Sequence, residues 1–289
     1  MRTFYYVHTG HRVGLDRFHR AASIVRQLQE ITDITLLCSD YRIAGEARNY
    51  GIKRAVGVDV VRNIPQIAQN GDRIIFDSDE VNPVLLEDMI RYFSTFIRIS
   101  DKPEETLHAD EYLISPYLHG ERIYTGVIVD EHYFEPCTKT IPIALFFGDD
   151  DYEKDLEKIQ SLFAPYKMDL LMGYYHFLGY ERELKESFQT IYESEEYEKV
   201  VRETEILVTS SPQAVLQSLA GGGKPVYIQR QDYADDFIEL FKTFNIPVIE
   251  ELTPENLAAA VNLAPSNNYH KISKSGGKEI DFIRETFNL

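Results

Sequence analysis

Residues 7–25 read VHTGHRVGLDRFHRAASIV, and this stretch decides the fold. A short apolar run at residues 4–7 is followed by a Thr9-Gly10 break and a basic turn. Apolar residues then recur at helical spacing, namely Phe18, Ala21, Ala22, Val25 and Leu28. The pattern predicts a strand, a loop and a helix, which is the opening unit of a nucleotide-binding α/β domain.

The predicted loop and the start of its helix are rich in basic side chains. They carry His8, His11, Arg12, Arg17, His19 and Arg20. The only acid among them is Asp16, although the formal net charge of the chain is −17. Either these cations hold an anion beside the helix N-terminus, or the loop is a solvated helix start that happens to be basic. We favour the anion, because the strand–loop–helix context supports it.

Composition sets the class of protein. A chain of 289 residues, with 44% apolar and 27% charged residues, fits a protein with one large or two ordinary domains. The excess of 47 acids over 30 basic residues argues against a nucleic-acid partner. No apolar run is long enough for a membrane span, and the N-terminal sequence lacks a signal-peptide pattern. Cys38 and Cys137 show no metal-site spacing and suit a reducing, cytoplasmic compartment.

The first half of the chain alternates between predicted strands and helices. We expect strands at residues 34–38, 55–58, 73–76, 96–99 and 112–114, and helices at 44–50, 61–69 and 84–93. Short apolar strands separated by helices predict a parallel sheet covered on both faces.

The rhythm is lost over residues 116–142 and then restarts. We expect strands at residues 143–147, 169–172, 206–208, 226–228 and 248–249, and helices at 149–163, 178–188, 197–203, 212–219, 235–244 and 254–263. A last helix at 279–287 is expected to pack back on the first domain. The sequence therefore predicts an α/β protein with two Rossmann-like domains, 1–140 and 141–289, facing a central ligand cleft.

The motifs follow a familiar order along nearly the whole chain. They are VGLDRFHR, IIFDSDE, a G-x-x-x-Y segment at residues 120–124, FFGDDD, and ILVTSSPQAVLQSLAGGGKPVYI. This order resembles the GT-B-fold nucleotide-sugar enzymes. The chain is most similar to the UDP-sugar hydrolase of the pseudaminic-acid pathway and to MurG-like glycosyltransferases. The resemblance implies an acceptor side in the N-terminal domain, and a UDP-sugar or other nucleotide-sugar on the C-terminal side.

In that family the first loop carries a Gly-x-Gly-His-x-x-Arg pattern, whose histidine acts on the water or the acceptor. Gly14 and Arg20 match the pattern, whereas Asp16 replaces its second glycine and Arg17 replaces its histidine. Arginine does not deprotonate at neutral pH, so Arg17 can clamp a phosphate but cannot act as a base. His11 or His19 then becomes the candidate for proton transfer.

An acid at the end of an early strand also matches the family. Asp77 takes this place, so we expect it to face the ligand. With Asp79 and Glu80 it forms an acidic trio. The trio either holds a divalent cation such as Mg²⁺ or is a solvated turn that caps the next helix, and we favour the turn.

Two further segments correspond to nucleotide-binding parts of the family. In FFGDDD, Gly148 matches a glycine turn that faces the diphosphate, while Asp149 and Asp150 depart from the pattern and suit the first turn of a helix. In the block at residues 209–225, Ser210 and Ser211 precede a helix whose amides can bind phosphate. The family's ribose-binding glutamate is missing, and Gln217 stands near its place.

The resemblance therefore implies a glycosyltransferase-like protein acting on a nucleotide-activated sugar. A UDP-sugar hydrolase and a catalytically inactive binding or regulatory relative are the alternatives. The candidate catalytic residues are Arg17, His11, His19 and Asp77. The candidate nucleotide-binding residues are Gly14, Arg20, Gly148, Ser210, Ser211 and Gln217. No metal is assigned, and the sequence leaves the sugar, the base, the acceptor and the oligomeric state open.

Overall fold

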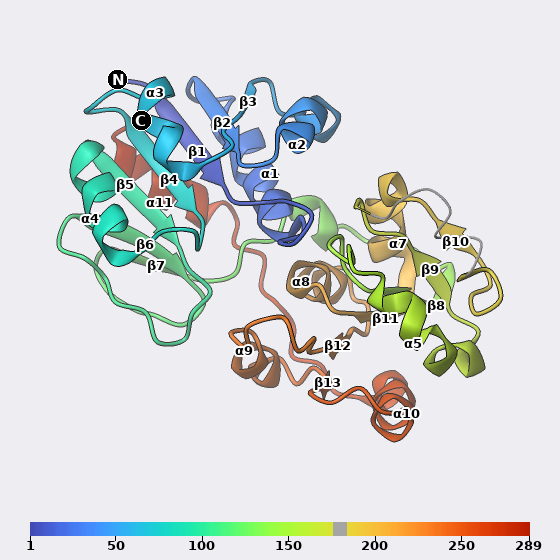
Figure 1. Cartoon of the computed structure of the whole chain (residues 1–289). Helices are drawn as coiled ribbons and strands as arrows, with labels where there is room; N and C mark the ends of the chain where they lie inside the picture. Colours follow the sequence, from blue (N-terminus) through green and yellow to red (C-terminus); the bar gives the residue numbers. More distant parts are fainter. Residues whose placement is uncertain (176–183) are drawn as a thin grey trace. The chain divides into compact units, whose positions relative to one another are not determined.

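A computed structural model describes residues 1–175 and 184–289 of the chain (Figure 1). Contacts between residues divide the chain into two compact units, each described by itself below. Unit 1 comprises Met1–Gly10, Arg17–Ile128 and Ser275–Leu289. Unit 2 comprises His11–Asp16 and Val129–Lys274.

Unit 1 contains a seven-stranded sheet in the order β3-β2-β1-β4-β5-β6-β7, and every neighbouring pair of strands is parallel. The strands are β1 (Thr3–Val7), β2 (Ile34–Cys38), β3 (Ala55–Gly57), β4 (Arg73–Asp77), β5 (Thr95–Ile99), β6 (Glu111–Ser115) and β7 (Ile123–Thr125). The central strand β1 is buried along its whole length, as expected for a parallel strand covered on both faces. The order of the first six strands is that of a Rossmann fold.

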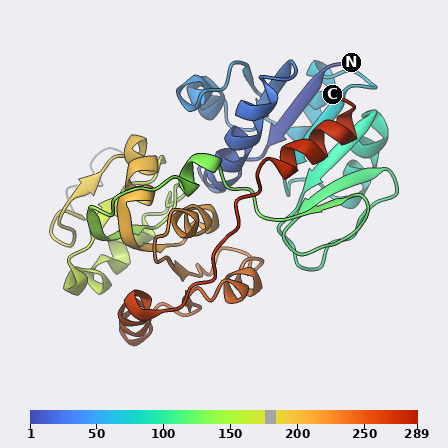
Figure 2. The same cartoon turned by 180° about the vertical axis from the view of Figure 1, so that it is seen from behind.

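Helices cover the sheet of unit 1. They are α1 (Asp16–Leu28), α2 (Tyr41–Glu46), α3 (Ile64–Ile67), α4 (Pro83–Tyr92) and α11 (Lys278–Phe287). The core between the sheet and helices α3 and α4 includes Tyr6, Phe76, Phe96 and Met89. The C-terminal helix α11 lies along the sheet and contacts β5, as Figure 2 shows.

Two helices predicted in unit 1 have different bounds. The helix predicted at residues 44–50 begins at Tyr41, because Asp40 caps it by accepting the Arg42 N–H at 2.8 Å. Residues 47–50 are a 3-10 turn. The helix predicted at residues 61–69 is a 3-10 turn followed by α3, and it stops where Ala68 is extended.

Unit 2 repeats the design with six parallel strands in the order β10-β9-β8-β11-β12-β13. The strands are β8 (Ile141–Phe146), β9 (Asp169–Leu171), β10 (Ile191–Tyr192), β11 (Thr204–Thr209), β12 (Val226–Ile228) and β13 (Val248–Ile249). This is again the Rossmann order, so the predicted α/β class with two Rossmann-like sheets is confirmed.

The described helices of unit 2 surround its sheet. They are α5 (Asp155–Ile159), α7 (Tyr197–Glu203), α8 (Pro212–Ala220), α9 (Ile238–Thr243) and α10 (Pro254–Leu263). Helix α8 is buried from Pro212 to Leu219 and packs on β11 and α7. The core on one face of the sheet includes Leu145, Phe163, Leu170 and Leu257.

The helix predicted at residues 149–163 is wrong at its start. The chain stays irregular to Lys154, and α5 begins only at Asp155. The reason is local: the Asp151 carboxylate accepts the N–H groups of Asp155 and Leu156 at 2.7 and 3.1 Å. Asp149 and Asp150 therefore precede the helix. The helix predicted at residues 178–188 lies partly outside the described residues.

Within the described ranges 1–175 and 184–289, every helix is too short or too polar to cross a bilayer.

Candidate functional site

The strand order of unit 2 indicates which edge of its sheet is the candidate ligand site. Strands β8 and β11 are neighbours at the point where the order reverses, and Phe146 pairs with Thr209 at their carboxyl ends. Ligands of open α/β sheets bind in the crevice at this switch point. Residues 147–151 and residues 210–211, which directly follow the two strands, are therefore at the candidate site.

Helix α8 begins at this edge with a complete N-cap. The Ser211 Oγ accepts the Ala214 N–H at 3.0 Å, and the Thr209 Oγ1 accepts the Ser211 N–H at 3.0 Å. Ser210 is fully buried, and its Oγ has no hydrogen-bond partner among the described residues. The predicted residues Ser210 and Ser211 thus lie together at a helix N-terminus, where amide groups and the helix dipole favour an anion.

That helix end holds a carboxylate of the chain itself. The Ser211 Oγ–H donates to Asp16 Oδ1 at 2.5 Å, and the Gln213 N–H donates to Asp16 Oδ2 at 3.1 Å. Asp16 belongs to residues 11–16, which are part of unit 2. The residue that replaces the family's second glycine is therefore an anion bound at the start of α8. Sequence spacing gave no signal for this contact, because the two partners are 195 positions apart.

Glycines allow two backbone segments to meet beside this helix. Gly148 has a φ of 109°, which favours glycine. A Cβ at Gly173 would lie 2.2 Å from the Gly148 carbonyl oxygen, so only glycine permits this approach of the β8 and β9 ends. The other predicted glycine, Gly14, is next to Asp150, since a Cβ at Gly14 would lie 3.8 Å from the Asp150 Cγ.

A cation at this edge was missed in the sequence. Arg230 follows β12 by two residues and is only 8% exposed. Its Nη1 donates to Asp150 at 3.0 Å, its Nη2 donates to Asp232 at 2.5 Å, and its guanidinium lies over the Tyr233 ring at 4.4 Å. The signal was available, because a basic residue two positions after the apolar run VYI lies near the carboxyl end of a strand.

Asp149 is a buried acid of the site, and its pKa is raised. Its Oδ1 accepts the Tyr174 N–H at 2.9 Å, while its Oδ2 is buried without a hydrogen bond from any described residue. Burial raises the pKa of Asp149 to about 7, and the nearby carboxylates of Asp16 and Asp150 add to the rise. A carboxyl group that titrates near neutral pH is typical of functional sites.

Gln217 lies on the buried side of α8. It is 2% exposed, and its Oε1 accepts the Tyr197 hydroxyl at 2.6 Å. The predicted ribose-binding position is thus occupied by a neutral amide that is held by helix α7.

Unit 1 has the corresponding switch point between β1 and β4, where Val7 pairs with Asp77. The predicted residue Asp77 is fully buried and accepts two bonds from Arg20, at 2.5 and 2.7 Å, and one from the Tyr5 hydroxyl at 3.0 Å. Arg20 also donates to Asp101 at 2.7 and 2.8 Å. The charge of the predicted phosphate-binding Arg20 is therefore matched by two carboxylates of its own unit.

Arg17 and His8 share one acid at the same edge. The Arg17 Nη2 donates to Asp79 at 3.0 Å, and the His8 Nδ1 is 2.8 Å from the other oxygen of Asp79. The hydrogen bond from His8, with help from Arg17, holds the pKa of Asp79 well below its usual value. His8 belongs to the basic group predicted around the first loop and directly follows the first strand, but it was not among the candidate catalytic residues.

The two predicted histidines, His11 and His19, contact different residues. His11, in unit 2, packs its ring against Tyr152 and Tyr175 at centroid distances of 4.9 and 6.5 Å. His19, in unit 1, packs edge-on to Tyr50. Burial, together with Arg26, lowers the pKa of His19, so this imidazole is neutral at neutral pH.

The acidic trio is bound by side chains of unit 1. Asp77 is bound by Arg20 and lies 3.8 Å from Arg17, Asp79 is bound by Arg17 and His8, and Glu80 accepts the Tyr6 hydroxyl and lies 3.8 Å from His8. Across the part of the chain that the structure describes, no three His, Cys, Asp or Glu side chains come together as metal ligands.

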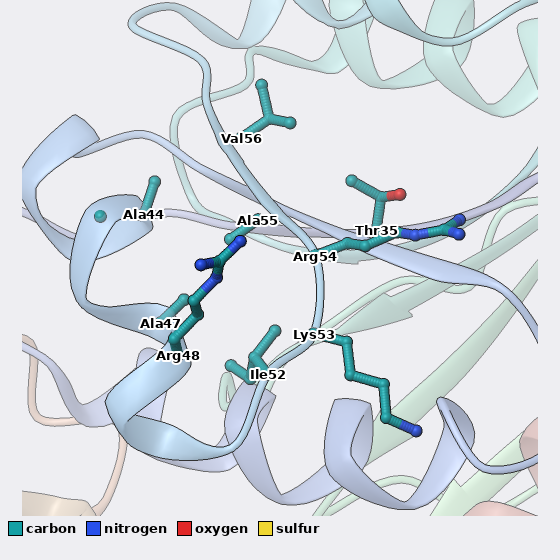
Figure 3. Close-up of a pocket in the computed structure, with 10 residues that line it drawn as sticks. Thr35, Ala44, Ala47, Arg48, Ile52, Lys53, Arg54, Ala55 and Val56 are labelled. Carbon is teal, nitrogen blue, oxygen red and sulfur yellow. The ribbon is translucent and has the colours of Figure 1, made fainter.

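A cavity of about 380 Å³ lies elsewhere in unit 1, between α2 and β3 (Figure 3). Arg48, Lys53 and Arg54 line it, but Lys53 pairs with Glu30 at 2.7 Å and Arg54 with Asp33 at 3.4 Å. The cavity contains none of the residues at the two switch points.

No protein-family model and no curated protein matches the sequence. Solved structures match the fold. A putative UDP-N-acetylglucosamine 2-epimerase from Listeria monocytogenes is 10% identical, with a TM-score of 0.67 over 99% of this chain and 96% of its own. The UDP-GlcNAc 2-epimerase of Methanocaldococcus jannaschii, solved with UDP-GlcNAc and UDP, is 10% identical, with a TM-score of 0.65 over 100% of both chains. MurG of Acinetobacter baumannii is 11% identical, with a TM-score of 0.56 over 99% of this chain and 100% of its own. The chain therefore has the GT-B fold.

Proposed function

We propose that this chain binds a nucleotide-activated sugar through unit 2 and acts on it as a glycosyltransferase-like protein. The observation that carries the proposal is the anion at the start of α8, where Ser211 and the Gln213 N–H hold the Asp16 carboxylate. These donors suit a phosphate oxygen equally well. The fold shared with a protein solved with UDP-GlcNAc and UDP supports the same ligand class.

In this proposal the diphosphate binds at the α8 N-terminus. Ser210 and Ser211 donate their hydroxyl groups, and Arg230, which already pairs with Asp150 and Asp232, is the cation at the neighbouring strand end. Gly148 and Gly173 let the backbone come close to the ligand. Nucleotide-binding sites at strand ends use the same combination of helix amides and glycine turns.

Binding is tested by calorimetry with UDP, CMP and GDP. We expect heat with at least one of the three, and Ser211→Ala lowers that affinity because the hydroxyl donor is lost. Thr253→Ala is the matched control: Thr253 caps α10 in the same way, with its Oγ1 accepting the Asn256 N–H at 3.1 Å. Both variants lose one N-cap, so only a site residue also changes affinity. Absence of heat with all three nucleotides overturns the proposal.

The proton-transfer role is assigned in this proposal to His11, the predicted histidine that belongs to unit 2 together with the start of α8. The family's histidine is replaced by Arg17, and the His11 ring is held against Tyr152 and Tyr175. We expect His11→Gln to slow release of the nucleoside diphosphate from a UDP-sugar by about 100-fold or more, as for loss of a general base. His119→Gln, at an exposed position in unit 1, is the control and retains the rate.

A non-catalytic binding protein is the second candidate. It is favoured by the internal partners of the predicted cations, since Arg20 is bound by Asp77 and Asp101. Nucleotide binding without release of nucleoside diphosphate, with either water or an alcohol as acceptor, would support this candidate over the first.

A further inference from the structure

The N-terminus of α8 already holds an anion, and this anion is the Asp16 carboxylate of the same chain. Asp16 Oδ1 takes the Ser211 hydroxyl and Asp16 Oδ2 takes the Gln213 N–H, so both carboxylate oxygens are bound. Asp16 is half-buried at this position, and α8 behind it is buried. A carboxylate that accepts hydrogen bonds from a hydroxyl and from an N–H group at a helix N-terminus makes the same contacts as a bound phosphate group.

The surroundings of Asp16 are unfavourable for a second negative charge. The buried Asp149 carboxyl is close enough for Asp16 to raise its pKa. The Oδ2 of Asp149 receives no hydrogen bond from any residue in the described ranges. A diphosphate entering beside Asp16 would therefore meet a buried acid with one oxygen that lacks a hydrogen bond, and a carboxylate that already holds the donors of the site.

We propose that Asp16 is an internal competitor for the phosphate position, so that a diphosphate binds at α8 only after it displaces the Asp16 carboxylate from Ser211 and Gln213. This inference rests on the proposed nucleotide site and adds the residue that sets its affinity. It predicts a protein that binds phosphate-bearing ligands more weakly than its donor set allows.

The test replaces the charge and keeps the shape. Asp16→Asn retains the side-chain outline but loses the negative charge, and its single acceptor oxygen can keep only one of the two bonds from Ser211 and Gln213, as a weaker neutral bond. We expect about tenfold or greater tightening of UDP and of inorganic pyrophosphate, measured by calorimetry. Uridine, which has no phosphate, should bind both proteins equally. Asp16→Gly, which removes the side chain, should tighten the same two ligands and serves if Asp16→Asn folds poorly.

A control acid is available in unit 1, outside both switch points. Asp72 is also buried and accepts two backbone N–H groups, from Arg2 at 2.7 Å and from Gln69 at 2.9 Å. Asp72→Asn removes an equivalent charge, and we expect it to leave UDP and pyrophosphate affinity unchanged.

The outcomes separate this inference from the proposed function. If the unchanged protein binds UDP and Asp16→Asn binds it no more tightly, the competitor role is wrong and the nucleotide site stands. If pyrophosphate binds only after Asp16 is replaced, and no nucleotide binds either protein, the competitor role holds and the nucleotide site fails. If neither protein nor Asp16→Gly binds UDP, CMP, GDP or pyrophosphate, both are overturned.

Discussion

Arg17 and Arg20 lie one helical turn apart in α1, yet their environments differ. Arg20 is buried between Asp77 and Asp101, whereas Arg17 is partly exposed and pairs with the half-exposed Asp79. A buried carboxylate that loses its partner is strongly destabilising, while an exposed ion pair contributes little. The same residue type therefore forms a buried ion pair at one position and a partly exposed one at the other, although Arg17 also lies 3.8 Å from Asp77.

We expect Arg20→Ala to lower the free energy of unfolding by about 3–5 kcal/mol, because two acids lose their cation. Arg17→Ala should change it by about 1 kcal/mol or less. Urea unfolding of both variants measures the difference. Equal losses would show that Arg17 is also a structural residue, and its predicted catalytic role would then be hard to separate from folding.

The titration of Asp149 makes the stability of unit 2 depend on pH. Its pKa is raised to about 7 in the folded chain, so between about pH 4 and pH 7 the folded state holds a proton that the unfolded state has lost. The contribution of Asp149 to stability is therefore fully present below pH 4 and declines as the pH rises to 7. The slope is on the order of 1.4 kcal/mol per pH unit at most.

We expect Asp149→Asn, which is neutral at every pH, to lack this decline. Relative to the unchanged protein the variant should gain stability steadily from pH 5 to pH 7 and level off above pH 7. Urea unfolding midpoints at pH 5, 6, 7 and 8 measure the gain. Asp59→Asn, at an exposed position, is the control. Parallel curves for Asp149→Asn and the unchanged protein would contradict the raised pKa.

At the scale of elements, the sequence predicts the parts that depend on local pattern. Apolar runs such as residues 34–38 and 226–228 became buried strands, and Pro254 after Thr253 correctly marked the start of α10. Helix starts were misjudged where a side-chain cap decided them. At α5, Asp151 delays the helix by six residues relative to the predicted start at 149.

The residues of the candidate site were likewise predictable only where a local sequence pattern indicates them. Ser210 and Ser211 were found because small residues follow a strand and precede a helix. The contact between Asp16 and Ser211 could not be found, since it depends on how a distant loop packs within unit 2. His8 directly follows β1 and Arg230 follows β12 by two residues, so a systematic search of strand ends would have included both.

The ends of β8 and β9 depend on one glycine. A Cβ at Gly173 would lie 2.2 Å from the Gly148 carbonyl oxygen and 2.8 Å from the Asp149 Cα, and both are backbone atoms that cannot turn away. We expect Gly173→Ala to lower the free energy of unfolding by about 1–3 kcal/mol or more. It should also weaken nucleotide binding, because Gly148 must move.

The control is Gly45→Ala in α2, where a Cβ meets nothing within 4 Å. This helical position should tolerate alanine or gain up to about 1 kcal/mol. Urea unfolding and nucleotide calorimetry on both variants give the comparison. A Gly173→Ala protein with unchanged stability would mean that the two strand ends separate easily.

At the scale of the whole molecule, the chain builds one sheet, then the other, and finally returns to the first. Residues 275–289 belong to unit 1, and α11 buries Ile280, Ile283 and Phe287 against it. The Phe282 ring also packs near Tyr112 and Tyr124 of strands β6 and β7. Unit 1 is therefore complete only after the last residues of the chain are in place.

This closure predicts where the chain loosens when α11 is weakened. Ile283→Ala and Phe287→Ala each remove a fully buried side chain, and each should lower the free energy of unfolding of unit 1 by about 2–5 kcal/mol. Hydrogen exchange should then rise in β4, β5 and β6 and stay unchanged in β8 and β11, because α11 belongs to unit 1 and these two strands to unit 2. Leu263→Ala, at a position that is 49% exposed in α10, is the control and should leave exchange in both sheets unchanged. If the two α11 variants raise exchange equally in both sheets, the units unfold together, and the stability of the nucleotide site in unit 2 then depends on a helix in unit 1.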